Sequence, residues 1–189
     1  DIGKSAWVQI AGKANYKQVV PEQVELVLHA LLGLYLSHGE LPPLYIISPF
    51  KQIKKDLIER IANPDHWRSI IGGSVKLPKK TELRDWCREH IGTVHTFQGK
   101  EKSIVWMVLG CDDATVGAAN WASDKPNLLN VAITRAQHRF FLIGDAGLWG
   151  DKPFFRDAKS QLPLISPHDF QNRMNLHPKI PQGVAKNLI

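Results

Sequence analysis

Apolar residues along the chain form strand-like runs that alternate with stripes at helical spacing. Residues 44–48 are an unbroken apolar run, typical of a strand covered on both faces, and residues 5–11 alternate as a strand does. Between these runs, Pro21 begins a strongly apolar segment at helical spacing, which we expect to end at Gly39. The pattern therefore predicts a strand, a long packed helix and a second strand.

The alternation continues as far as residue 145. A helix that starts at the Ser48-Pro49 pair is expected to include Phe50 and to end at Asn63-Pro64. Strands that alternate with helices indicate an α/β domain with a mainly parallel sheet, in which ligands bind at the carboxyl ends of the strands. The other predicted elements are a helix at 81–90 capped by Thr81, strands at 91–96, 103–110 and 139–145, a helix at about 127–137, and an irregular segment at 111–126.

The composition is that of an ordinary globular protein. Of 189 residues, 43% are hydrophobic and 22% are charged, and the formal net charge of +6 is a mild argument for a polyanionic partner. No apolar run is long enough to cross a bilayer, and Cys87 and Cys111 cannot build a disulfide framework, so we expect a reducing, cytoplasmic setting and no membrane. The chain begins with Asp1 rather than Met, which we expect of a piece of a longer protein.

Two short stretches match part of a known ligand-binding motif but lack the rest of it. Gly3-Lys4-Ser5 matches the end of a phosphate-binding P-loop, but no glycine-rich arc precedes it and a strand follows it, so we expect no nucleotide there. Cys87 and His90 lie one helical turn apart, but no second pair of ligands stands at a structural-zinc spacing. We therefore expect no metal site.

The stretch IISPFKQ, residues 46–52, places polar groups at the end of a predicted strand. The Ser48 hydroxyl and the N–H groups after Pro49 face the space above the sheet, where they can contact a phosphate, with Phe50 near a base or sugar. The alternative is simple capping of the helix, with Phe50 in the core.

The stretch TVHTFQGKE, residues 93–101, is a second strand end with concentrated polar chemistry. Thr93 and His95 are two residues apart and share one face of a strand, and Gly99 permits a sharp turn before Lys100 and Glu101. A semi-buried, hydrogen-bonded role for His95 is the alternative.

The stretch LLNVAITRAQH, residues 128–138, presents an arginine from a helix that packs closely on the sheet. Arg135 is therefore aimed across a cleft, and its planar, permanently charged guanidinium suits developing phosphate charge. A surface salt bridge is the alternative. The expected packed face is Leu129, Ala132, Ile133 and Ala136, with Asn130 and Thr134 on another face.

In this order, the three stretches resemble motifs IV, V and VI of superfamily 1 helicases, in the branch whose motif V reads FQG, a basic residue and Glu (UvrD-like or AAA-type helicases). The resemblance covers roughly residues 5–145. It implies the second, C-terminal RecA-like motor domain over residues 1–150: a three-layer, P-loop NTPase-like fold without its own P-loop. Residues 151–189 are then a partly helical extension. Asp112 and Asp113 imitate a Mg²⁺-binding acidic motif, but their place directly after motif V argues against that role.

The resemblance also implies roles for individual residues. Arg135 is the arginine finger that completes an ATP site on the N-terminal RecA-like domain of the same protein, which holds ATP with Mg²⁺, and Asn130 and Thr134 support it. The strand that is pulled is single-stranded DNA or RNA. The implied nucleotide contacts are Gln98, Gly99, Lys100 and Glu101, and the implied nucleic-acid contacts are Ser48, Pro49, Phe50, Thr93, His95 and Thr96.

The sequence departs from the family pattern at one position. Many relatives carry a second arginine near the stretch Asn15–Glu22, whereas here the only arginine before residue 68 is Arg60. Lys13 or Lys17 cannot reproduce the guanidinium fork. A non-catalytic nucleic-acid-binding module built on a degenerate helicase domain is therefore the alternative to a motor, whereas a self-sufficient NTPase is nearly excluded because the P-loop is incomplete.

Overall fold

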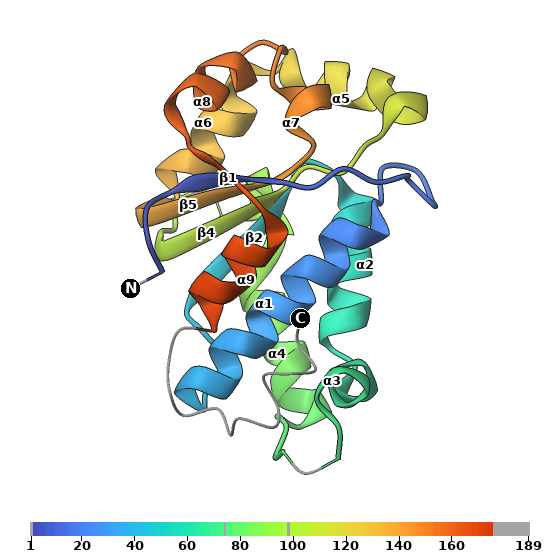
Figure 1. Cartoon of the computed structure of the whole chain (residues 1–189), viewed down its shortest axis with the longest axis vertical. Coiled ribbons are helices and arrows are strands. Elements are labelled where there is room, and N and C mark those ends of the chain that lie inside the picture. Colours follow the sequence, from blue (N-terminus) through green and yellow to red (C-terminus); the bar gives the residue numbers. More distant parts are fainter. Residues whose placement is uncertain (1, 74, 98, 176–189) are drawn as a thin grey trace.

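Six parallel strands form one sheet, in the order β3-β2-β4-β5-β1-β6. Figure 1 labels the four neighbouring strands β2, β4, β5 and β1. The structure is a computed structural model, and it describes residues 2–73, 75–97 and 99–175. The expected α/β, RecA-like class with a parallel sheet is confirmed. The strands are β1 (Ala6–Gln9), β2 (Leu44–Ser48), β3 (Ile91–Thr93), β4 (Lys102–Val108), β5 (Ala136–Gly144) and β6 (Leu164–Ile165).

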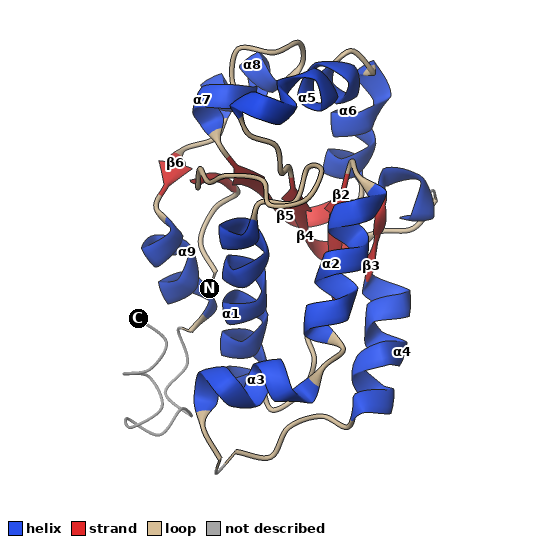
Figure 2. Cartoon of the chain, turned by 90° about the vertical axis from the view of Figure 1, so that its right-hand side faces the viewer, coloured by secondary structure: helices blue, strands red, loops and turns tan. Residues whose placement is uncertain are grey.

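Helices cover both faces of the sheet, which gives three layers (Figure 2). One face carries α1 (Pro21–His38), α2 (Lys51–Ile61), α4 (Lys80–His90) and α9 (Pro167–Met174), with α3 (Pro64–Ile71) at the far end of this layer. The opposite face carries α5 (Val116–Ser123), α6 (Pro126–Thr134), α7 (Ala146–Trp149) and α8 (Phe155–Gln161).

The first three predicted elements match the structure closely. All five residues of β2 are buried, as expected for a strand between two others in a covered sheet. Helix α1 begins at Pro21, and Gly39 ends it with a φ of 78°, a left-handed conformation in which its N–H donates to Tyr35 O at 2.7 Å. The sequence predicted both ends of α1 correctly because proline favours the first turn of a helix and glycine adopts the left-handed conformation that ends it.

The C-terminal part of the described chain adds to the same sheet. Strand β6 pairs with β1 through Trp7 and Val8. Phe170 of α9 is fully buried, and its ring centroid lies 5.3 Å from those of both Trp106 and Phe141. These ring contacts, edge-to-face with Trp106 and tilted with Phe141, pack α9 against the centre of the sheet. The predicted extension therefore contains core residues as far as Met174, which is also buried.

The predicted strand at 91–96 is wrong beyond Thr93. Residues Val94–Phe97 form a 3₁₀ turn instead, so His95 does not lie on a strand. The Thr96 hydroxyl accepts a hydrogen bond from Thr93 N at 3.0 Å, and this contact folds the chain back over Gly92. A Cβ at Gly92 would lie 2.5 Å from Thr96 Cβ, so the turn requires glycine at this position.

Three other local predictions also need correction. Helix α2 begins at Lys51, and Phe50 precedes it with its N–H donated to Ser48 Oγ at 3.3 Å. Helix α4 begins one residue before Thr81, because Glu82 accepts a hydrogen bond from Lys79 N at 2.8 Å. The segment 111–126, expected to be irregular, contains α5 after a short 3₁₀ turn at Asp113–Thr115.

Candidate nucleic-acid and nucleotide sites

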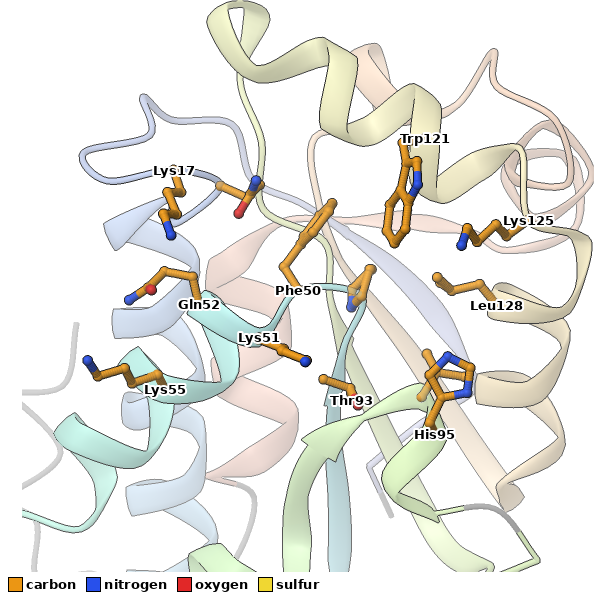
Figure 3. Close-up of a pocket in the computed structure, with 13 residues that line it drawn as sticks. Lys17, Phe50, Lys51, Gln52, Lys55, Thr93, His95, Trp121, Lys125 and Leu128 are labelled. Atoms are coloured by element: carbon orange, nitrogen blue, oxygen red, sulfur yellow. The ribbon is translucent and has the colours of Figure 1, made fainter.

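The carboxyl ends of β2 and β3 open into a cavity of about 510 Å³ between α2 and the α5–α6 pair (Figure 3). We call it the basic groove. In an open parallel sheet this is the expected place for a ligand. The residues that line it are Lys17, Gln18, Pro49, Phe50, Lys51, Gln52, Lys55, Thr93, Val94, His95, Trp121, Lys125 and Leu128.

Four of the six expected nucleic-acid contacts line the basic groove: Pro49, Phe50, Thr93 and His95. The 3₁₀ turn, and not an extended strand, brings Thr93 and His95 to the same cavity. His95 is exposed, whereas the Phe50 side chain is largely buried at 7% exposure. Thr93 and His95 can therefore meet a strand directly, and Phe50 forms the floor.

The other two expected contacts lie elsewhere. Ser48 is fully buried, and its hydroxyl holds the Phe50 N–H, so it positions the chain and does not reach the groove. Thr96 is exposed but lines a different pocket, and its hydroxyl is engaged by Thr93 N. Both residues shape the backbone that carries the groove contacts.

The groove is cationic because four lysines line it and none of its described lining residues is acidic. Lys51 and Lys55 stand one turn apart on α2, and a neighbouring cavity of about 400 Å³ extends this wall past Lys54. Such a surface attracts the phosphates of a polyanion and gains free energy by releasing counterions. Part of the positive charge of the chain thus lies at a strand-end cavity.

Two groove residues come from the segment that the sequence left unassigned. Trp121 on α5 is 54% exposed, and Lys125 lies over its ring with Nζ 4.1 Å from the ring centroid. Lys125 lies between α5 and α6, so the turn between these two helices, and not helical spacing, brings it to Trp121. Lys51 and Lys55 are four residues apart on the predicted helix after Pro49 and were also missed.

The loop that supplies Thr93 and His95 continues into a second site at Arg135. Arg135 Nη1 donates to Phe97 O at 3.4 Å and to Lys100 O at 3.3 Å. We call Phe97, Gly99 and Lys100, with the Arg135 side chain, the Arg135 turn. Gly99 has a φ of 78°, which suits glycine, and Lys100 N donates to Phe97 O at 3.0 Å to close the turn.

Helix α6 places Arg135 at its C-terminal end. The Arg135 Nε donates to Val131 O at 3.3 Å and its Nη2 to Thr134 Oγ1 at 3.4 Å, so the guanidinium is held across the end of the helix. Asn130 and Thr134 are exposed, as expected, but Ile133 is 39% exposed and is not part of the packed face. The helix ends at Thr134, because Ala136 already begins β5.

Of the expected nucleotide contacts, Gly99, Lys100 and Glu101 are exposed beside Arg135, and Gln98 lies outside the described residues. A polar pocket of about 330 Å³ lies next to the Arg135 turn, and its lining residues are Tyr45, Arg88, Glu89, His90, Thr96, Phe97, Lys100 and Lys102, so three cations and one carboxylate face it. The Glu101 carboxylate accepts a long hydrogen bond of 3.4 Å from Gln137. The loop from Thr93 to Glu101 thus has one end in the basic groove and the other at Arg135.

The remaining polar candidates have structural partners. The Asp112 carboxylate accepts hydrogen bonds from Thr115 Oγ1 at 2.8 Å and from Ala14 N at 2.8 Å, and these contacts hold its pKa below the usual value. Burial raises the pKa of the Cys87 and Cys111 thiols to about 12, so neither is a nucleophile near neutral pH. In the described ranges, no group of three or more His, Cys, Asp and Glu side chains is placed to hold a metal ion.

Within residues 2–73, 75–97 and 99–175, none of the helices has the length and apolar character needed to span a bilayer. In a comparison with protein families, residues 6–147 match the family described as an AAA domain, which is most of the chain. Among curated proteins, none matches the sequence.

Proposed function

Because the chain belongs to the AAA domain family and is a helicase-type domain, we propose that it is the C-terminal motor domain of an ATP-dependent helicase or translocase of superfamily 1. In this proposal it supplies Arg135 and the strand contacts, and a second RecA-like domain supplies the P-loop. ATP with Mg²⁺ provides the phosphoryl group that is transferred to water.

The proposal rests on one observation above all: a single loop joins the basic groove to Arg135. Thr93 and His95 line the groove, and a few residues later the Phe97 and Lys100 carbonyls accept hydrogen bonds from Arg135. A loop with these two ends can couple movement of a bound strand to movement of the guanidinium.

The surroundings of Arg135 fit a role toward a polyphosphate. Its hydrogen bonds to the chain measure 3.3–3.4 Å, longer than the usual range for N–H···O bonds. Because such bonds are weak, an anion that approaches the end of α6 can replace the carbonyl acceptors at small cost. Charged, bidentate hydrogen bonds to phosphate are stronger than those to neutral carbonyls.

Other residues of the Arg135 turn have roles in this proposal. Arg135 stabilises negative charge on the transferred phosphoryl group, as arginine fingers do in related phosphoryl-transfer enzymes. Glu101 accepts a hydrogen bond from the nucleotide ribose, and Gly99 lets the backbone approach the phosphates closely because it has no side chain. Asn130 and Thr134 hold the end of α6, and the Thr134 hydroxyl donates to Val131 O at 3.0 Å.

A non-catalytic nucleic-acid-binding module is the second candidate, and Arg60 favours it. The Arg60 side chain is bound to Glu25 and to Asp56, the latter at 3.2 Å, so the arginine nearest in sequence to Asn15–Glu22 is already paired on α2. No second guanidinium is therefore available to the phosphates from this part of the described chain. The basic groove serves either function.

A strand-stimulated ATPase assay separates the two candidates. The protein that joins this chain to its P-loop-bearing domain is expected to hydrolyse ATP faster when single-stranded DNA or RNA is added, with both tested in parallel. The 189-residue chain alone is expected to bind strands without hydrolysis. Strand binding by the joined protein with no stimulated hydrolysis would identify the non-catalytic module, and strong ATPase activity of the chain alone would refute a shared site.

A further inference from the structure

Trp121 is exposed in a chain that buries its other tryptophans. The sequence contains six, and Trp7, Trp67, Trp106 and Trp149 are fully buried, while Trp86 is 7% exposed. Trp121 is 54% exposed and lines the basic groove. Leaving an indole in water forgoes the free energy of burial, so its position at a cationic groove suggests a ligand for the ring.

Helix α5 holds Trp121 in a defined place. Ala119 and Ala122 are fully buried and pack α5 on the body of the domain, which leaves Trp121 on the outer side. Lys152 Nζ donates to Asn120 Oδ1 at 2.5 Å, which ties the helix to the segment after α7. The helix that carries the ring is therefore held in place before a ligand arrives, and this lowers the entropy lost on binding.

The two walls of the basic groove differ in chemistry. In Figure 3, Trp121 projects from α5 over the cavity, with Lys125 on its α6 side. On the opposite wall, Lys51 extends from α2 toward the cavity and Lys55 extends along the outer side of the same helix. One wall thus presents an aromatic face with an ammonium group 4.1 Å from its centroid, and the other presents lysines alone. A single strand has the same two-sided chemistry, with flat bases on one side and phosphates on the other.

We propose that Trp121 is a base-stacking residue for single-stranded nucleic acid. The strand lies in the basic groove with its bases toward Trp121 and its phosphates toward Lys51 and Lys55. This inference rests on the proposed function, because it assigns an orientation to the strand that the motor domain binds. It adds Trp121 to the strand contacts and makes the α5–α6 side the base-binding side.

Charge favours a nucleic acid over a protein as the occupant. Four lysines and no acidic residue line the described groove, and the aromatic ring itself carries a lysine on one side. A protein interface centred on a tryptophan typically depletes lysine and surrounds the ring with apolar residues. Stacking on a base is compatible with the lysines, because the same ligand neutralises them.

Fluorescence provides the test, since Trp121 is the tryptophan that solvent reaches. Titration of the 189-residue chain with oligothymidylate or oligouridylate of about eight nucleotides, at about 50 mM salt, is expected to quench the emission. An abasic oligomer of the same length carries the same charge but no bases, and it is expected to bind without quenching. The two base-containing arms show whether DNA or RNA is preferred.

Variants separate stacking from charge. Trp121→Ala is expected to weaken oligothymidylate binding by about 5- to 150-fold, and Trp121→Phe is expected to retain most of the affinity. Trp121→Ala is expected to leave the salt dependence of binding unchanged, because it removes no cation. Because the Trp121 side chain is exposed, we expect Trp121→Ala to fold like the wild type. Circular dichroism of both variants checks the fold.

Each outcome decides a different claim. Quenching by base-containing oligomers together with the loss in Trp121→Ala supports the stacking role. If the wild-type chain binds the oligomers but Trp121→Ala binds them equally and no quenching occurs, the stacking role is refuted and the strand-binding function stands. If the chain binds none of the oligomers even at low salt, the proposed function fails, and the assignment of Trp121 fails with it.

Discussion

The basic groove and the Arg135 turn are built on one loop, but their cations differ in whether they are hydrogen-bonded to the protein. In the described chain, the ammonium groups of Lys51 and Lys55 have no hydrogen bond or ion pair with another side chain, and both residues line open cavities. The Arg135 guanidinium instead contacts Val131, Thr134, Phe97 and Lys100. The groove can bind a strand without rearrangement, whereas Arg135 must exchange its partners before it can act.

This difference suits a motor domain. A strand-binding surface that is ready in advance loses little free energy to reorganisation. An arginine that reaches phosphate only after a partner domain closes keeps hydrolysis low until the site is complete. The comparison predicts that changes in the groove alter strand affinity and that changes at Arg135 alter turnover.

The largest expected effect is that of Arg135→Ala on ATP turnover. In the protein that joins this chain to its P-loop-bearing domain, we expect turnover to fall by about 10³–10⁵-fold while nucleotide affinity changes little, because the guanidinium acts on charge that develops in the transition state. Steady-state hydrolysis with saturating strand measures this. Arg84→Ala, at an exposed position on α4, is the matched control and should keep wild-type turnover. Equal turnover in both variants would remove Arg135 from the catalytic role.

A smaller effect is expected from the groove lysines. Lys51→Ala combined with Lys55→Ala should reduce the slope of log affinity against log salt by about 1.4, since each lysine contact to a single strand contributes about 0.7. Oligonucleotide binding by the 189-residue chain over a range of salt concentrations measures the slope. The pair Lys76→Ala and Lys80→Ala changes two exposed lysines outside the groove and should leave the slope as it is. A similar slope change in both pairs would mean that net charge, and not the groove, binds the strand.

The smallest expected effect is the pH dependence of stability that comes from His90, in the pocket beside the Arg135 turn. Burial lowers the pKa of His90 from its ordinary value of 6.5, and its ring stacks on Trp86 at 4.8 Å. The unfolded chain therefore binds a proton on His90 that the folded chain does not. Stability is complete above a pH of about 6.5 and falls as the pH drops below it.

Urea unfolding at about pH 7.5 and pH 5.5 measures this dependence. His90→Phe keeps an aromatic ring at the site and should flatten the change, leaving a remainder from His29, whose pKa burial also lowers. An unaltered pH dependence in His90→Phe would show that protonation of His90 does not contribute to it and would contradict the burial of this ring.

The sequence predicted those parts of the site that local signals define. Proline and glycine marked α1, and the apolar run marked β2, so the end of β2 before Pro49 was in the right place, whereas the strand that carries Thr93 was expected to run three residues too far. The position of Arg135 beside the loop of motif V was implied by the family resemblance and not by local sequence signals. Whether these residues bind nucleotide and strand stays a prediction.

The features that the sequence analysis missed depend on specific contacts, which the spacing of hydrophobic residues does not report. The turn after Thr93 forms because the Thr96 hydroxyl binds Thr93 N over a residue without a side chain. Helix α5 is rich in small residues and shows no broad apolar stripe, so Trp121 was not recognised as part of a helix beside the groove. Lys51 and Lys55 were visible in the sequence, but only the fold shows that their helix forms a wall of the cavity.

The most direct measurement is the coupling between nucleotide and strand in the protein that joins both domains. Strand affinity is measured with and without a non-hydrolysable ATP analogue, for the wild type and for Arg135→Ala. If one loop links the basic groove to the Arg135 turn, the analogue should change wild-type strand affinity by about 5- to 150-fold. It should leave the strand affinity of Arg135→Ala nearly unchanged. The same factor in both proteins would contradict the account, because strand and nucleotide would then communicate without Arg135.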